Sequence, residues 1–158
     1  MNKYLAAVAL SGTLAQPAVA VTFPTLTTIY VGSGVRNTSD PINEGIATAF
    51  FCTNASGLTA NLRFLVLNFN GNVAGSVTVS TVLHGQTRTI TTHGITFLGN
   101  DSTDTSQGTI IDQGSIIIEA TESGVFCTAA VFDAEGFPPV FSTPLHLVRV
   151  NPHPGTVE

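Results

Sequence analysis

The chain has 158 residues, and charged residues make up only 9% of it, against about 25% in an average globular protein. After the first 20 residues the sequence retains four Arg, no Lys and ten acidic residues, which gives a net charge of −6. This balance argues against nucleic acid as a partner, because such binding depends on cationic contacts to phosphate. It also argues against attachment to an anionic membrane surface.

The first 20 residues are typical of an export signal. Lys3 stands near the start, an apolar run extends from Tyr4 to Ala15, and small residues occupy positions 18 and 20. A positive segment, a short apolar stretch and small residues at the cut are the parts of a secretory signal. We therefore expect cleavage after Ala20, no stable membrane insertion afterwards, and a periplasmic or extracellular protein.

Beyond the signal, the sequence predicts one all-β domain over residues 21–150 and a Pro-containing tail over residues 151–158. Short runs rich in Val, Ile, Thr and Phe alternate with clusters of Gly, Asn, Asp and Pro, which is typical of an antiparallel two-sheet sandwich. No helix is predicted. About eight strands are expected, near residues 26–31, 45–53, 60–69, 73–83, 86–93, 115–120, 124–133 and 144–150.

Local patterns refine this picture. The dipeptide Asn70-Gly71 predicts a tight hairpin, because both residue types tolerate positive φ angles, and Gly32 and Gly34 are interpreted as turn glycines. A strand with Thr on one side, residues 87–91, should lie towards an edge or have a solvated face. Three segments are apolar on both faces and should therefore lie centrally in their sheets. They are residues 64–67, 116–118 and 125–132.

The two cysteines of the chain, Cys52 and Cys127, each lie within a Phe-Cys-Thr triplet on a predicted strand. In an oxidising compartment this favours one disulfide between those strands. Two separate buried thiols are the alternative. A catalytic thiol is disfavoured, because neither cysteine lies at a loop or a helix start where a thiolate would be stabilised.

The histidines permit a metal site without indicating one. His84 and His93 flank one predicted strand and His146 lies on another, so a cluster is conceivable. No two of the four histidines share a ligand-like spacing such as His-x-His, however. Our interpretation is that they are surface or strand-end residues, and we predict no metal or other cofactor.

A polar stretch at residues 99–108 separates two predicted strands. Asn100, Asp101 and Asp104 lie within it and Asp112 follows, and such oxygen ligands suit Ca²⁺. The spacing does not match a helix-loop-helix calcium site, and an ordinary solvated loop uses the same residue types. We favour the solvated loop.

Other catalytic and modification patterns are weak. Neither Ser33 nor Ser115 lies in a Gly-x-Ser-x-Gly elbow. Glu119 and Glu122 form the one close carboxylate pair near a strand, and a continuing strand would direct them to opposite faces. No catalytic residues are predicted. Three triplets, which begin at Asn37, Asn54 and Asn100, fit the glycosylation acceptor pattern.

Several features in chain order resemble those of small exported bacterial β-sandwich proteins of uncharacterised role, over about residues 45–150. The resemblance implies an immunoglobulin-like sandwich in the envelope or medium. In immunoglobulin-type sandwiches a bridge joins the two sheets, and the placement of Cys52 and Cys127 matches that inter-sheet bridge. The matching segments are Phe51-Cys52-Thr53-Asn54, Asn70-Gly71-Asn72-Val73-Ala74-Gly75, Gly85-Gln86-Thr87, Gly114-Ser115-Ile116 and Val125-Phe126-Cys127-Thr128-Ala129.

These observations favour an exported, non-catalytic domain that binds an envelope protein or a glycan, or serves as a structural component. One alternative is a pilus-like or polymeric subunit, for which residues 21–28 would form the donated arm. The other is a metal-dependent enzyme that uses His84, His93 or His146.

Overall fold

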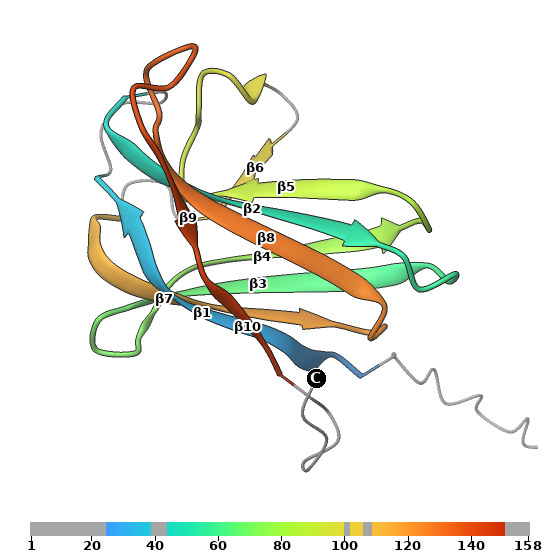
Figure 1. Cartoon of the computed structure of the whole chain (residues 1–158). Helices are drawn as coiled ribbons and strands as arrows, with labels where there is room; N and C mark the ends of the chain where they lie inside the picture. Colours follow the sequence, from blue (N-terminus) through green and yellow to red (C-terminus); the bar gives the residue numbers. More distant parts are fainter. Residues whose placement is uncertain (1–24, 39–43, 100–101, 106–108, 151–158) are drawn as a thin grey trace, which may run out of the picture.

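The computed structural model describes residues 25–38, 44–99, 102–105 and 109–150 (Figure 1). The predicted signal, residues 1–20, and the predicted tail, residues 151–158, lie outside this part of the chain. Among the described residues there is no α-helix, and so none that could cross a membrane. The strands are β1 Thr27–Asn37, β2 Ile46–Asn54, β3 Ala60–Asn68, β4 Val73–Val82, β5 Thr87–Thr91, β6 Ser102–Asp104, β7 Ile111–Ala120, β8 Val125–Asp133, β9 Ser142–Leu145 and β10 Leu147–Arg149.

The strands form two five-stranded sheets, which confirms the predicted two-sheet sandwich. Sheet A has the order β10-β1-β7-β3-β4, and sheet B has the order β6-β5-β2-β8-β9. Neighbouring strands are antiparallel except for β5 and β6, which are parallel. The three segments predicted to be central lie in β3, β7 and β8, and each of these strands has a neighbour on both sides.

The core lies between the sheets and follows the two-residue period of a strand. Leu62, Phe64 and Val66 alternate along β3, and each is fully buried. From sheet B, Phe50 meets them, with its ring centroid 6.4 Å from that of Phe64. Burying a side chain of this kind contributes about 1.5–3 kcal/mol, so the alternating apolar positions determine which face of each strand turns inward.

The β3–β4 hairpin is confirmed at the predicted dipeptide. The Gly71 N–H donates to the Asn68 carbonyl at 3.0 Å. Gly71 has a φ of 83°, whereas Asn70 keeps a negative φ. One left-handed residue is therefore enough to reverse the chain here.

The prediction that Gly32 and Gly34 belong to a turn is wrong, because both lie inside β1. Gly34 has a φ of 92° and lies where the register between β1 and β7 shifts, so it forms a bulge within a continuing strand. A Cβ at Gly32 would come within 2.7 Å of the Leu147 side chain. Glycine at position 32 thus lets the β9–β10 segment approach β1 closely.

The predicted last strand, residues 144–150, is two strands in different sheets. β9 pairs with β8 of sheet B, and β10 pairs with β1 of sheet A. Figure 1 shows the two in red, running as one ribbon from one sheet to the other. His146 lies at the crossing. The sequence alternation continues across this position, so it carries no sign of the change of sheet.

The predicted disulfide between Cys52 and Cys127 is present. The two residues are direct cross-strand partners on β2 and β8, which are neighbours in sheet B, with Cα atoms 4.2 Å apart. The bridge therefore lies within one sheet, and its predicted inter-sheet placement is corrected. The bridge encloses a separation of 75 residues, for which chain entropy predicts about 4.5 kcal/mol of stabilisation.

The two sheets are joined near the end of β10 by Arg149. Its guanidinium carbon lies 5.2 Å from the ring centroid of Phe126 on β8 and 5.6 Å from that of Tyr30 on β1. The same guanidinium donates to the Ser123 carbonyl. Such contacts between a cation and aromatic rings contribute about 0.5–1 kcal/mol at exposed sites, so Arg149 fastens the short β10 strand to both layers.

Candidate functional site

The β8–β9 loop presents an apolar tip. Residues 134–141 read Ala-Glu-Gly-Phe-Pro-Pro-Val-Phe, and the loop lies at the top of Figure 1, in orange-red. Phe137 is 79% exposed and Val140 is 88% exposed. Exposed apolar side chains of this size, when they cluster, mark contact sites more often than scattered ones do. The loop tip is therefore the first element of the candidate site.

Hydrogen bonds from Asp133 hold this loop in one conformation. Its carboxylate accepts the N–H of Glu135 at 3.2 Å and the N–H of Val140 at 3.0 Å. Its own N–H donates to the Phe141 carbonyl at 3.2 Å. Two consecutive prolines, 138 and 139, add fixed φ angles. Because the loop is already ordered, a partner that binds it does not have to meet that entropic cost.

A groove of about 300 Å³ lies beside the tip, where the β9–β10 segment leaves sheet B. Its wall is mainly apolar, and Phe141 belongs to both the loop and the groove. One cation, Arg36, and one imidazole, His146, also line it. The side chains that matter here are Arg36, Ile46, Val131, Phe141, Leu145 and His146.

The open edge of β1 forms part of the groove. β10 pairs with residues 30–32 of β1, so within the described part of the chain Ser33 and Gly34 have no paired strand on that side. Both residues line the groove. An unpaired strand edge beside an apolar groove suits an extended polypeptide, which can add a strand and place a side chain in the hollow.

The three histidines considered as metal ligands do not form one site. His84 accepts the N–H of Gly57 at 3.1 Å. His93 is buried, and its Nε2 lies 2.8 Å from the Glu44 carbonyl while its Nδ1 contacts Asn37. His146 is exposed at the groove. In the described part of the chain, no three His, Cys, Asp or Glu residues are placed to hold a metal ion.

The polar stretch at residues 99–108 is partly a strand, which the sequence did not indicate. Ser102–Asp104 form β6, and the Thr91 hydroxyl donates to Asp104 at 2.6 Å. Asn100 and Asp101 lie outside the described residues. Among the residues considered as Ca²⁺ ligands, Asp104 accepts the hydrogen bond that holds β6 against β5.

Two of the three glycosylation triplets are occluded. Asn37 and Asn54 are both fully buried. The Asn54 amide donates to the carbonyls of Leu58 and Val82, each at 2.7 Å. A glycan needs an exposed asparagine, so these two residues have structural roles. Asn100, in the third triplet, lies outside the described residues.

The sequence did not reveal the candidate site, because its residues are of types that are common in ordinary turns and strands. Gly, Pro and Phe in residues 136–141 indicate a turn, and a turn can bury or expose its apolar residues. The available signal was the density of large apolar side chains in a loop that also contains two prolines. Arg36 and Ile46 could not be placed beside it without the strand order.

No family model matches the chain, and no curated protein or solved structure is significantly similar to it.

Proposed function

We propose that this protein is an exported, non-catalytic β-sandwich domain that acts by contact, as a binding or structural component of the cell envelope or secretome. The observation that carries the proposal is the rigid apolar tip of the β8–β9 loop beside an apolar groove. Geometry of this kind serves recognition without requiring bond-breaking chemistry.

The partner that best fits the site is an extended polypeptide with an apolar side chain and a neighbouring acidic or carbonyl group. The apolar wall of the groove and the exposed Phe137 and Val140 would bury the apolar side chain. The guanidinium of Arg36 would receive the oxygen atoms. The open edge at Ser33 and Gly34 would pair with the partner backbone.

Two of the residues considered for catalysis already have structural partners. Glu119, one of the close acidic pair, is bonded to Arg63. His93 is buried and is held by Asn37 and Glu44. A catalytic acid or base must be free to reach its substrate, and the contacts of these two residues favour the non-catalytic part of the proposal.

The pilus-like alternative gains no support. It requires residues 21–28 as a spare arm, but Thr27 and Thr28 are already part of β1 and pair with Ala120 and Glu119 of the same chain. Residues 21–24 lie outside the described part. We therefore do not propose donor-strand assembly.

The test is capture from an envelope extract by immobilised protein that begins at Val21. The double variant Phe137→Ser, Val140→Ser should lose at least ten-fold in the captured amount of a partner. Phe69→Ser is the matched control, because Phe69 is a phenylalanine with a similar exposure of 80% on the β3–β4 hairpin. The binding site is refuted if the double variant captures as much as the control.

A second measurement tests the lack of catalysis. The purified protein is assayed against a broad panel of hydrolase and oxidoreductase substrates. Turnover that survives stringent repurification would overturn the non-catalytic part of the proposal, whatever the capture experiment shows.

A further inference from the structure

The outward face of sheet A carries an aliphatic row that crosses four strands. Strand partners that lie directly opposite each other point to the same face. Val148 is opposite Val31, Val31 is opposite Ile117, and Ile117 is opposite Leu65. Their neighbours at positions 64, 116 and 118 are fully buried in the core, so the row itself points away from the core.

This row is open to solvent. Val31 is 37% exposed and Val148 is 51% exposed, while Ile117 and Leu65 are half-buried. In an antiparallel sandwich the outward face of a strand is expected to be polar. A continuous row of four aliphatic side chains on that face departs from this expectation, and such patches mark interaction sites.

The surroundings of the row are mainly polar. Thr28 and Thr78 lie on one flank, and Ser76 continues the row on β4. On the other flank Ser33 and Ser115 are followed by Leu67 and Val73, which extend the apolar surface. Among the described residues, the register places the charged pair Arg63 and Glu119 on this face, and the two are bonded to each other. A second copy placed on the face would therefore meet an apolar centre, a mainly polar rim and a compensated ion pair.

A hollow of about 380 Å³ lies beside the row. It forms where small residues, Gly32, Ser33 and Ser115, interrupt the larger ones. Ridge and hollow thus lie side by side on one face. A two-fold axis through such a face places the ridge of each copy over the hollow of the other, which is the self-complementary arrangement of an isologous dimer.

We propose that the outward face of sheet A is a homodimer interface, in which two copies pack sheet against sheet. Four strands about 30 Å long and the three-residue β10, spaced about 4.8 Å apart, give a face of roughly 600 Å². Standard interfaces bury about 600–1,000 Å² per partner. The face therefore reaches the lower end of that range, and aligned packing of two twisted sheets is a common arrangement.

Within the described residues, Val31 and Val148 stay partly exposed, so that part of the chain leaves the row without a complete cover. A second copy supplies a complementary row of equal length, which is why we choose it as the occupant.

The first test is sedimentation equilibrium of the protein from Val21 to Glu158. The wild type should show a concentration-dependent dimer, and Ile117→Lys should raise the dimer Kd at least 100-fold, because two lysines would meet near the axis. Thr128→Lys, an exposed position on the outward face of sheet B, is the control and should leave the Kd unchanged. A wild type that stays monomeric up to millimolar concentration would overturn the proposal, as would an equal effect of the control.

The second test does not depend on the folding of the lysine variant. Both native cysteines are bonded to each other, so Ser115→Cys introduces a single reactive thiol. Because packed sheets lie about 10 Å apart, a bismaleimide of about that span should link two copies of Ser115→Cys, and Thr128→Cys should stay unlinked. Equal linking of the two would refute the interface. The double variant with Phe137→Ser and Val140→Ser should dimerise normally. The dimer interface can therefore be tested independently of the proposed binding site at the tip of the β8–β9 loop.

Discussion

The outward faces of the two sheets differ in what covers them. On sheet B, the segment after β5 folds back over β2, so that Ile95 is buried together with Ala47 and Ala49. Phe97 adds an edge-to-face contact with Phe132, with ring centroids 5.2 Å apart. On sheet A, none of the described segments covers the row that contains Val31 and Ile117 in this way, and the row remains partly exposed.

This difference shows that strands which are apolar on both faces can have their outward face covered in two different ways. Strands that are apolar on both faces were expected in the centre of each sheet, and β3, β7 and β8 are indeed interior strands. Central position within a sheet does not protect the outward face, however. On sheet B a connecting segment of the chain provides that protection, whereas on sheet A we propose that a second copy does.

The largest expected effect concerns the disulfide, which fastens sheet B alone. Replacing Cys52 and Cys127 together by Ala should lower the free energy of unfolding by about 3–4 kcal/mol, because the unfolded chain regains the entropy of a 75-residue loop. Urea unfolding measures the change. Reduced wild-type protein should match the double variant, and a loss below about 1 kcal/mol would show that the bridge does not stabilise the sandwich.

The comparison of the faces is tested by making one substitution on each. Ile95→Ala should cost about 2–4 kcal/mol, because Ile95 is almost fully buried and its loss leaves a cavity above sheet B. Ile117→Ala should cost less than about 1 kcal/mol in dilute protein, because Ile117 is only half-buried. Urea unfolding at low concentration gives both values.

Equal losses for Ile95→Ala and Ile117→Ala would show that the outward face of sheet A is as well covered as that of sheet B. At high protein concentration the two variants should converge. The proposed dimer would then bury Ile117, so that its truncation would also carry the cost of a lost interface contact.

Most of the fold followed from the sequence because it depends on local chemistry. Runs rich in Val, Ile, Thr and Phe between clusters of turn residues located β2, β3, β4, β7 and β8 to within a few residues, and Asn70-Gly71 located the hairpin. β6 was not predicted, because the residue types of this polar stretch do not favour a strand. The strand forms because β6 pairs with β5 and because Thr91 donates a hydrogen bond to Asp104.

Strand order is the information that the sequence lacked, and the candidate site depends on it. Cys52 and Cys127 reach bonding distance whether their strands face each other across the core or lie side by side. The pairing was therefore predictable, while its placement within sheet B was not. The groove has the same origin, since Arg36 and Leu145 are distant in sequence and meet only because β9 and β10 lie in different sheets.

A smaller effect is expected at the anchor of the sheet B cover. His93 lies two residues before Ile95, and its ring contacts Asn37 and the Glu44 carbonyl. His93→Ala should lower the free energy of unfolding by about 2 kcal/mol, because buried hydrogen bonds are lost.

Hydrogen exchange locates the effect of His93→Ala. The Thr96 N–H, which donates to the Ala134 carbonyl at 2.9 Å, should exchange faster than in the wild type. The Gly71 N–H, in the distant β3–β4 hairpin, should be unchanged. Uniform acceleration at both sites would mean that His93 supports the whole sandwich and not the cover in particular.

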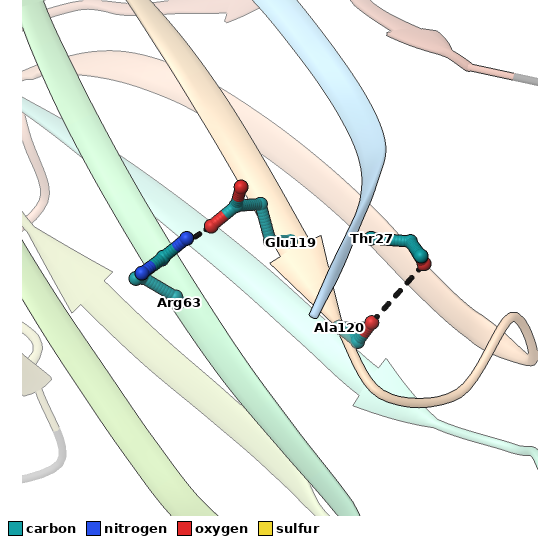
Figure 2. A network of polar contacts seen from close by, with 4 residues as sticks. All are labelled: Thr27, Arg63, Glu119 and Ala120. Atoms are coloured by element: carbon teal, nitrogen blue, oxygen red, sulfur yellow. Dashed lines mark hydrogen bonds and ion pairs between the residues drawn. The ribbon is translucent and has the colours of Figure 1, made fainter. Parts of the chain in front are cut away.

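The smallest effect is expected for the ion pair on the outward face of sheet A. Figure 2 shows Arg63 on β3 reaching Glu119 on β7 across the strands, and Thr27 donating to the Ala120 carbonyl nearby. Arg63→Gln should leave the midpoint of urea unfolding within the scatter of surface substitutions, because exposed ion pairs are screened by solvent. A double-mutant cycle with Glu119→Gln measures the coupling, and a large coupling would contradict the expectation.

The pH dependence of this pair follows from the sign of one shift. The hydrogen bond to Glu119 raises the pKa of Arg63 above its ordinary value, and burial opposes that change. A raised pKa gives stability that is present below the unfolded-state pKa and is lost only as the pH rises through the folded-state pKa. The guanidinium therefore stays charged at every pH at which the protein can be studied. Unfolding midpoints between pH 6 and pH 9 should show the same difference between the wild type and Arg63→Gln, and a difference that changes with pH would mean that another group titrates against this pair.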